Sequence, residues 1–150
     1  MTELDALAAD GFGHWLAGFI DGEGCFVIHG TAGGRLKCRL AVAVRADELP
    51  TLETIQARTG AGTIVTRPQR GTTKPEATWQ VQSRPDCLRM AEIFDRFPLR
   101  AKKARDYAIW RSALRTWATV RRTGYPGVND EVWRRMEASR KALNEGRRFV

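Results

Sequence analysis

Two sets of charged residues in this sequence have the types and spacing to do chemistry. The first set is a pair of carboxylates, Asp21 and Glu23, which flank Gly22 and precede a second glycine. The second set is four cations at positions 35, 37, 39 and 45, with no acid between them. Cations at every second residue share one face of a β-strand, where they repel each other unless an anion lies across them. This face therefore predicts contact with nucleic acid rather than an ordinary solvated surface.

Glu23 is placed by residues 15–24, which have the pattern of the last turns of a packed helix. Leu16, Phe19 and Ile20 fall at i, i+3 and i+4 and therefore share one apolar face. The helix is expected to end at one of the two glycines that flank Glu23, where φ can become positive. The Glu23 carboxylate would then lie just past the last turn and point away from the hydrophobic layer.

The other faces of this helix carry almost no bulk, because Ala17, Gly18 and Gly22 lie on them. A glycine inside a helix costs about 1 kcal/mol relative to alanine, so Gly18 requires a structural reason. Close approach of a second backbone is such a reason, since small residues allow two helices to pack tightly.

Period-2 patterns predict two pairs of strands around the cationic face. Residues 25–29 are strand-like, and a glycine-rich turn at 30–34 leads into an alternating strand over 35–45. A second pair is expected at 63–67 and 77–82, and its glutamines suit adenine edges. The outward positions of these strands and their loops are the candidate nucleic-acid contacts: Val27, His29, Thr31, Arg35, Lys37, Arg39, Arg45, Thr63, Val65, Arg67, Arg70, Thr78, Gln80 and Gln82.

Helical patterns surround these strands. They are expected over residues 47–58, 85–97, 103–120 and 130–144, with a break at Pro126-Gly127 before the last. Asp47 is the predicted N-cap of the first of them. Residues 1–13 are expected to be a short acidic lead-in, in which Asp10-Gly11 caps the helix that precedes Glu23.

The resulting order of elements is αββαββα, which predicts an α+β fold with an antiparallel sheet left open on one face. The length of 150 residues supports a single domain over residues 1–150. Its core is expected at about 12–118, and residues 121–150 form a basic C-terminal helical extension. A packing helix is the simpler interpretation of this extension, and extra phosphate contacts are the alternative.

The charge distribution favours a polyanionic partner. The net charge is +8, and residues 1–99 hold 11 Lys and Arg against 12 Asp and Glu, whereas residues 100–150 hold 14 against 5. A basic balance of this size indicates nucleic acid before a membrane surface. Arg outnumbers Lys 20 to 5, which suits phosphates and guanine edges, although GC-rich coding produces the same bias.

Several other classes of function find no support in the sequence. It contains neither GxxxxGK[ST] nor GxSxG, and its cysteines and histidines lack the spacing of a zinc site. The three cysteines are expected to be reduced and mostly packed. No apolar run approaches the ~20 residues of a membrane span, and the start lacks a basic signal region. We therefore expect a cytoplasmic protein of a bacterial or phage host, or an organellar matrix protein.

Residues 16–24, LAGFIDGEG, resemble the LAGLIDADG motif that names a large family of homing endonucleases. The match covers all nine positions with conservative changes, which include Phe for Leu at the fourth and Glu for Asp at the eighth. The element order agrees with the LAGLIDADG fold, whose saddle-shaped antiparallel sheet faces DNA. The sequence holds no second copy of the motif.

The resemblance implies a homodimer, because family members with a single motif pack two motif helices across a two-fold axis. The interface would be built from Ala17, Gly18, Asp21 and Gly22. Glu23 would then approach its symmetry mate, and two such close carboxylates require cations. The implied cofactor is Mg²⁺, or another divalent cation such as Mn²⁺, with the backbone carbonyl of Gly22 as a further ligand.

The implied activity is metal-dependent hydrolysis of one phosphodiester in each strand of double-stranded DNA, across the minor groove, with 3′ overhangs. A two-fold symmetric protein implies a pseudo-palindromic target of roughly 20 base pairs. By the same resemblance Lys102 is the candidate for a basic residue near the scissile phosphate, with Lys103 as the alternate. Asp47 is a candidate to hold the nucleophilic water, a role that competes with its N-cap interpretation.

Two other functions stay open from the sequence. One is a maturase that binds intron RNA and assists splicing, which would keep the basic sheet without needing the acids. The other is a DNA-binding regulator with an inactive site. The presence of Glu23 favours the nuclease.

Overall fold

The computed structural model describes residues 1–120 and 131–147. The elements are α1 (Glu3–Ala9), α2 (Phe12–Glu23), β1 (Gly24–Gly30), β2 (Leu36–Arg45), the 3₁₀ turn η1 (Ala46–Glu48), α3 (Leu49–Thr59), β3 (Thr63–Arg67), β4 (Glu76–Val81), α4 (Arg84–Arg96), α5 (Lys103–Ala118) and α6 (Glu131–Glu145). From α2 to α4 the order is the predicted αββαββα, so the predicted α+β fold is confirmed. The break expected at Pro126-Gly127 lies outside the described residues.

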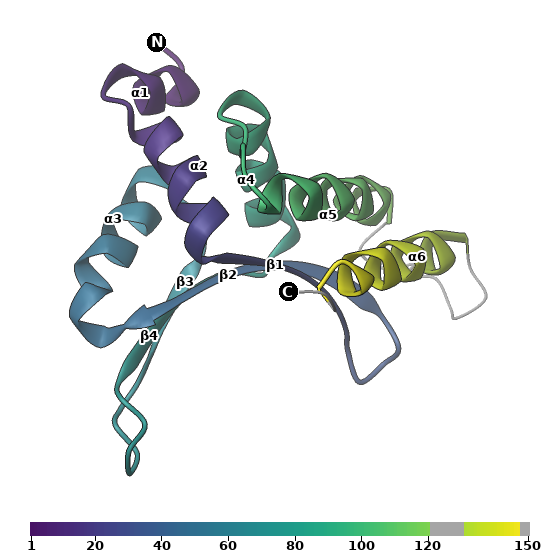
Figure 1. The fold of residues 1–150 in the computed structure, drawn as a ribbon. Helices are drawn as coiled ribbons and strands as arrows, with labels where there is room; N and C mark the ends of the chain where they lie inside the picture. Colours follow the sequence, from purple (N-terminus) through teal and green to yellow (C-terminus); the bar gives the residue numbers. More distant parts are fainter. Residues whose placement is uncertain (121–130, 148–150) are drawn as a thin grey trace.

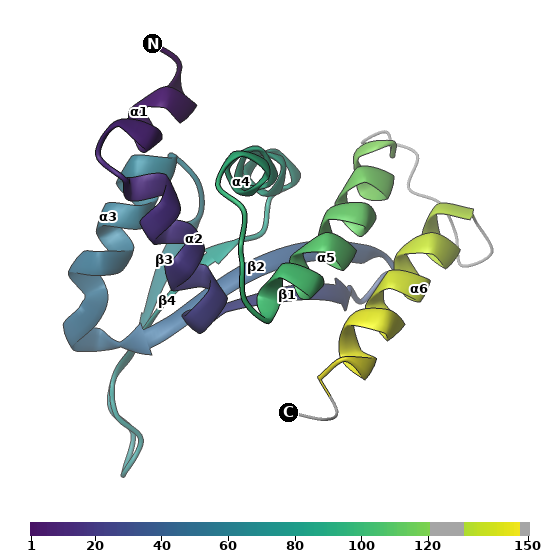
Figure 2. The ribbon, with the colours of Figure 1, turned by 45° about the horizontal axis from the view of Figure 1, so that its top comes forward.

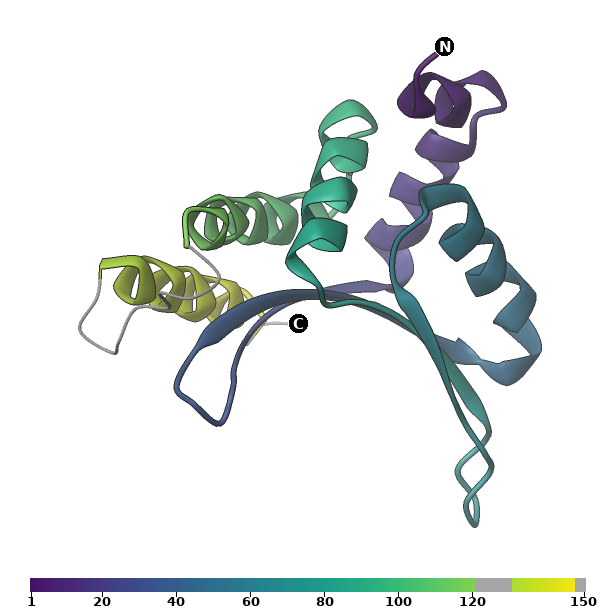
Figure 3. The same ribbon diagram turned by 180° about the vertical axis from the view of Figure 1, so that it is seen from behind.

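The four strands form one antiparallel sheet in the order β1-β2-β4-β3. Within the two hairpins, β1 pairs with β2 and β3 pairs with β4. In the centre of the sheet, β2 pairs with β4. The sheet is strongly curved, with the helices on its convex side and its concave side open (Figures 1 and 3). The turns of the two hairpins lie at opposite ends of the curved sheet.

The hydrophobic core lies between the convex face of the sheet and the helices. Every second side chain of β2, from Leu36 to Val44, is at most 8% exposed, as the period-2 pattern predicts. Trp79 and Val81 of β4 are fully buried on the same face, and the Trp79 indole N–H donates to the Ala61 carbonyl at 2.9 Å. No helix of the described part of the chain is long and apolar enough to cross a membrane.

The face of α2 that enters the core differs in part from the prediction. Leu16 and Ile20 are fully buried as expected, but Ala17 is also buried, at 3% exposed. Phe19 is only half-buried, and its ring stacks on the exposed Trp15 ring at 5.1 Å. The buried face of α2 is therefore rotated from the predicted stripe toward Ala17.

The junction between α2 and β1 also corrects the prediction. Gly24 follows the last helical residue with φ −78°, so a positive φ is not what this position requires. A Cβ on Gly24 would instead lie 2.7 Å from Ile20 Cγ2 and 2.8 Å from the Ile20 carbonyl oxygen. Glycine is needed here because the chain turns directly over the preceding helical turn.

The N-terminal segment is a helix rather than a simple lead-in. Thr2 and Asp5 form a reciprocal capping box at the start of α1. The hydrogen bond from Arg96 of α4 is the largest reason that the pKa of Asp5 falls to about 2. Asp10 accepts from the Phe12 N–H at 3.2 Å, so the predicted contact of Asp10 with the start of α2 is present.

Candidate active site and nucleic-acid interface

The register of the sheet arranges the outward-facing residues in rows that cross its concave side. From the β1–β2 turn to the far end of the sheet, the rows are His29 and Lys37; Val27 and Arg39; Cys25, Ala41, Gln80 and Thr63; Ala43, Thr78 and Val65; and Arg45, Glu76 and Arg67. Thr31 and Arg35 lie at the β1–β2 turn, Arg70 lies at the β3–β4 turn, and Gln82 follows β4. The predicted contacts therefore share one face and its two turns, and all are exposed or half-exposed.

This concave face is cationic at both ends and has small residues in the middle. Lys37 and Arg39 occupy one end of β2 and Arg45 the other, while Ala41 and Ala43 lie between them. The pKa of the neighbouring His29 is lowered, first by partial burial and then by repulsion from Arg39 and Lys37, so the imidazole is neutral at neutral pH. The arrangement can accept a polyanion along the full length of the sheet.

Glu76 is a functional candidate that the sequence prediction assigned to a loop. It opposes Arg45 on one side and Arg67 on the other, and it forms an ion pair with Arg67. Its carboxylate therefore lies within the cationic face, where it holds the Arg67 guanidinium. The signal that could have found it is period-2 spacing, since Glu76 lies two residues before Thr78.

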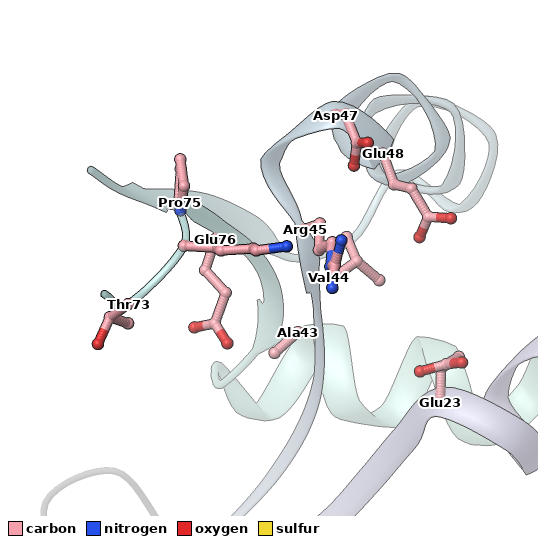
Figure 4. Close-up of a pocket in the computed structure, with 10 residues that line it drawn as sticks. Glu23, Ala43, Val44, Arg45, Asp47, Glu48, Thr73, Pro75 and Glu76 are labelled. Carbon is pink, nitrogen blue, oxygen red and sulfur yellow. The ribbon is translucent and has the colours of Figure 1, made fainter. Parts of the chain in front are cut away.

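Glu23 is the last residue of α2 and is exposed. It lines a groove of about 560 Å³ together with Ala43 and Arg45 of the concave face, and with the carboxylates of η1. Figure 4 shows Glu23 on one side of β2 and Glu76 on the other, with Asp47 and Glu48 near the end of the strand. The motif acid thus faces the same space as the outward residues of β2.

Asp47 does not cap α3. It lies inside η1, and Glu48 occupies the N-cap position, where the described chain provides no side-chain capping bond. The N-cap interpretation is therefore wrong, because the chain makes an extra 3₁₀ turn before the α-helix begins. The Asp47 carboxylate is left facing the groove that Glu23 lines.

Asp21 has a partner within the protomer. Its Oδ2 accepts the backbone N–H groups of Arg100 at 2.8 Å and Ala101 at 3.1 Å, which fixes the turn before α5. These bonds connect residues about eighty positions apart, so they tie the end of α2 to the chain that precedes α5. The position is half-buried, and its main contacts are internal rather than at a free surface.

Of the two candidate lysines, Lys103 is the one that lies against the motif helix. Its Nζ donates to the carbonyls of Asp21 and Gly22, each at 3.3 Å. An ammonium at this place also complements the negative end of the α2 dipole. Lys102 occupies the N-cap position of α5, is exposed, and lines a neighbouring pocket of about 330 Å³ with Lys103.

The donors for a divalent cation are incomplete in one protomer. The Glu23 carboxylate and the Gly22 carbonyl are hard oxygen ligands at exposed positions, which suits Mg²⁺ or Mn²⁺. However, residues 1–120 and 131–147 contain no group of three or more His, Cys, Asp or Glu side chains that could hold a metal. The donor set fits such an ion only when further oxygen ligands join it.

The exposed side of α2 carries the glycines of the predicted interface. A Cβ built on Gly18 or Gly22 would meet no atom within 4 Å in the described part of the chain. Ala17 is a correction to the predicted interface, because its side chain is buried against the core of its own protomer. Trp15, at 45% exposed, extends the open face of Gly18 toward the start of α2.

The fold, an αββαββα core with the motif acid beside a curved sheet, is that of LAGLIDADG proteins. A sequence model described as LAGLIDADG endonuclease matches residues 16–114, which is more than half of the chain. The chain belongs to this family, and its single motif and single-domain size fit the single-motif type. No curated protein sequence matches the chain.

Solved structures of the same fold include several homing endonucleases. The LAGLIDADG meganuclease I-AabMI, bound to uncleaved DNA, matches with a TM-score of 0.73 and 23% identity over 88% of this chain and 44% of its own. The archaeal intron-encoded I-Vdi141I, complexed with DNA, matches at 0.72 and 17% over 91% and 84%. I-SmaMI, bound to uncleaved DNA with calcium ions, matches at 0.72 and 20% over 89% and 45%. The chain thus spans less than half the length of I-AabMI and I-SmaMI.

Proposed function

We propose that this protein is a site-specific double-strand DNA endonuclease that acts as a homodimer. The observation that carries the proposal is that Glu23 shares one groove with Ala43 and Arg45 of the cationic concave face. An acid that could hold a metal and a surface that could hold DNA therefore meet at one place. The similarity to I-AabMI and I-Vdi141I, both described as bound to DNA, supports DNA as the ligand.

A dimer is supported by the open face of α2 and by the single copy of the motif in the sequence. Gly18 and Gly22 have empty space outside them, although a helical glycine costs about 1 kcal/mol relative to alanine. Isologous packing of two α2 helices brings the two Glu23 residues together.

In such a dimer the divalent ion would be held by Glu23 and the Gly22 carbonyl of each protomer, with DNA phosphate oxygens as further ligands. When bound, Mg²⁺ or Mn²⁺ polarises the phosphate, lowers the pKa of a water and stabilises the leaving 3′ oxygen. Asp47 faces the same groove and can accept a hydrogen bond from that water. Lys103, which contacts Gly22, adds positive charge near the scissile phosphate.

The concave face sets the scale of the target. At ~3.3 Å per residue, the ten residues of β2 extend ~33 Å, which is about one turn of B-DNA. Gln80 of β4 and Gln82 just after it can read adenine edges, and Arg39, Arg45 and Arg67 can read guanine or bind phosphate. Two half-sites give a pseudo-palindromic target of roughly 20 base pairs, and we expect cleavage to leave 3′ overhangs.

The test is selection of cleaved sites from a DNA library by the purified protein with Mg²⁺, repeated with EDTA and with the Glu23→Gln variant. We expect one pseudo-palindromic site, cut only when both the metal and Glu23 are present. Glu48→Gln is the matched control, because Glu48 lines the same groove on a different element. Binding by Glu23→Gln should stay near that of the original protein.

Two outcomes would overturn the proposal. Specific binding without cleavage in Mg²⁺ or Mn²⁺ would indicate a DNA-binding regulator, and tighter binding of intron RNA than of DNA would indicate a maturase. The same assay separates the lysines: Lys103→Ala should slow cleavage far more than Lys102→Ala. Equal reductions in the cleavage rate would show that the contact of Lys103 with Gly22 has no role in the reaction.

A further inference from the structure

Helix α6 lies outside the segment that the family model matches, yet it is packed into the fold. The match ends at residue 114, whereas α6 covers Glu131–Glu145. Met136 and Leu143 of α6 are fully buried in the core. Figure 2 shows α6 running alongside α5 and next to β1. This helix is therefore an integral part of the domain on the side of the β1–β2 hairpin.

The two ends of α6 reach the two ends of this hairpin. At its start, the Trp133 indole N–H donates to the carbonyl of Gly34, in the turn between β1 and β2, at 3.1 Å. Just beyond its end, Arg147 donates to the carbonyl of Phe26, near the start of β1. The 15 residues of α6 extend ~22 Å and the 7 residues of β1 extend ~23 Å, so the helix matches the strand in length.

The turn that Trp133 contacts is rich in glycine and lies at the end of the sheet (Figure 1). It contains Gly33 and Gly34, and a Cβ on either would meet no atom within 4 Å among the residues described by the structure. Its own backbone bonds are Thr31 N–H to Arg35 O at 2.8 Å and Gly34 N–H to Thr31 O at 3.0 Å. The β1 strand is also an edge of the sheet, so among the described residues it pairs with β2 alone.

The other hairpin provides a comparison within the same molecule. The turn of the β3–β4 hairpin extends away from the helices in Figures 1 and 3, although its strands pack against α3. Its turn is closed by two reciprocal backbone hydrogen bonds between Arg70 and Thr73, of 3.1 and 2.8 Å. In the described part of the chain, a helix therefore contacts the turn of the β1–β2 hairpin but not the turn of the β3–β4 hairpin (Figure 1).

We propose that α6 braces the β1–β2 hairpin in its DNA-reading position, with Trp133 and Arg147 as positioning residues. Fixing the hairpin before DNA arrives removes the loss of conformational freedom that binding would otherwise incur. The side chains that depend on the brace are those of the turn and of the first row, which include His29, Arg35 and Lys37. The inference rests on the proposed function for its DNA-reading part only.

The first test needs no DNA and compares amide hydrogen exchange in the full chain and in Trp133→Phe. This variant keeps an aromatic ring but lacks the indole N–H. We expect the amides of Thr31 and Gly34 to exchange about two- to tenfold faster, the effect of one lost hydrogen bond. The amides of Arg70 and Thr73 should not change. Equal acceleration in both turns, or none in either, would overturn the brace.

The second test measures the base preference of the same proteins with a library of randomised half-sites. Trp133→Phe should lose preference, by about threefold or more, at base pairs under the β1–β2 turn and keep it under β3–β4. Arg147→Ala should act in the same direction from the other end of α6. Arg135→Ala is the control, because Arg135 is exposed on α6 and pairs with Glu131.

The outcomes of the two tests are separable. Faster exchange in the β1–β2 turn with an unchanged preference profile would overturn the positioning role of α6 in reading DNA. A uniform loss of preference over the whole site, shared by Arg135→Ala, would show that α6 acts only through overall stability. If the unsubstituted protein binds no DNA, the proposed function fails, while the exchange measurement still decides whether α6 holds the hairpin.

Discussion

Replacing Gly18 by leucine should stabilise the protomer while it separates the dimer. Gly18 lies inside α2 on the exposed side, with no described atom within 4 Å of a built Cβ. Within one protomer the substitution therefore adds a helix-favouring residue without a clash. In the proposed dimer, the new side chain lies between two helices whose close approach depends on glycine.

The substitution should have opposite effects on the stability of the protomer and on the affinity of the dimer. Leucine in place of a helical glycine contributes about 0.8–1 kcal/mol to the free energy of unfolding of the protomer. That gain corresponds to a rise of about 2–4 °C in Tm for a domain of this size. Overpacking costs about 1–3 kcal/mol for each leucine, and a two-fold symmetric interface contains two of them. A total of about 2–6 kcal/mol raises the dimer Kd by about 30-fold to about 10⁴-fold.

The assay combines sedimentation velocity with thermal unfolding at two protein concentrations. We expect Gly18→Leu to sediment as a monomer and to have a Tm that does not depend on concentration, because dissociation precedes unfolding. Gly13→Ala is the matched control on the same helix. A Cβ at Gly13 would lie 2.6 Å from the ring of the buried Phe97, so this smaller change should lower Tm without dissociating the dimer.

Two results would refute this reasoning. If Gly18→Leu keeps the dimer mass, the two-fold interface lies elsewhere and the open face of α2 has another explanation. If Gly18→Leu unfolds the protein at all concentrations, the protomer itself requires glycine at this position. The leucine side chain would then have no free space beside α2 in solution.

Two further predictions concern the concave face. The pKa of His29 is lowered from its usual 6.5, so the unfolded chain binds more protons just below that pH. The free energy of unfolding should therefore decrease as the pH falls below about 6.5, and His29→Gln should reduce this slope in denaturant titrations at pH 5.5 and 7.5; an unchanged slope would contradict it. Cys25 is exposed on the concave face, whereas Cys38 and Cys87 are buried, which raises the pKa of Cys87 to about 12. Iodoacetamide should modify Cys25 alone, and bound target DNA should slow this modification. An unchanged modification rate in the presence of DNA would show that DNA does not bind to the concave face.

Local patterns predicted a large part of this protein. The alternation in β2 identified both its buried face and its cationic face, because side chains of a strand alternate whatever the strand pairs with. The nine-residue motif identified the family, since its helix, glycines and acid lie within one short segment. The order αββαββα followed from turns and periodicity in the same way.

Contacts between distant segments could not be read from local patterns. The buried side of α2 was misjudged because Ala17 and Phe19 flank the shared face of Leu16 and Ile20 on opposite sides, and periodicity alone does not show which flank enters the core. Asp47 was assigned to a cap because the extra 3₁₀ turn has no pattern of its own. The sequence interpretation also preferred Lys102 to Lys103, and only the fold shows that Lys103 is the one that contacts Gly22.

The sequence by itself thus determined the family, the fold class and the charge of the concave face, since each depends on residues close together in the chain. The tertiary structure alone decided which outward residues share a row, that Glu76 lies among the arginines, and that α6 packs along β1. These features depend on strand register and on packing between segments far apart in the chain. Their partners lie up to 121 residues away, as for Arg147 and Phe26.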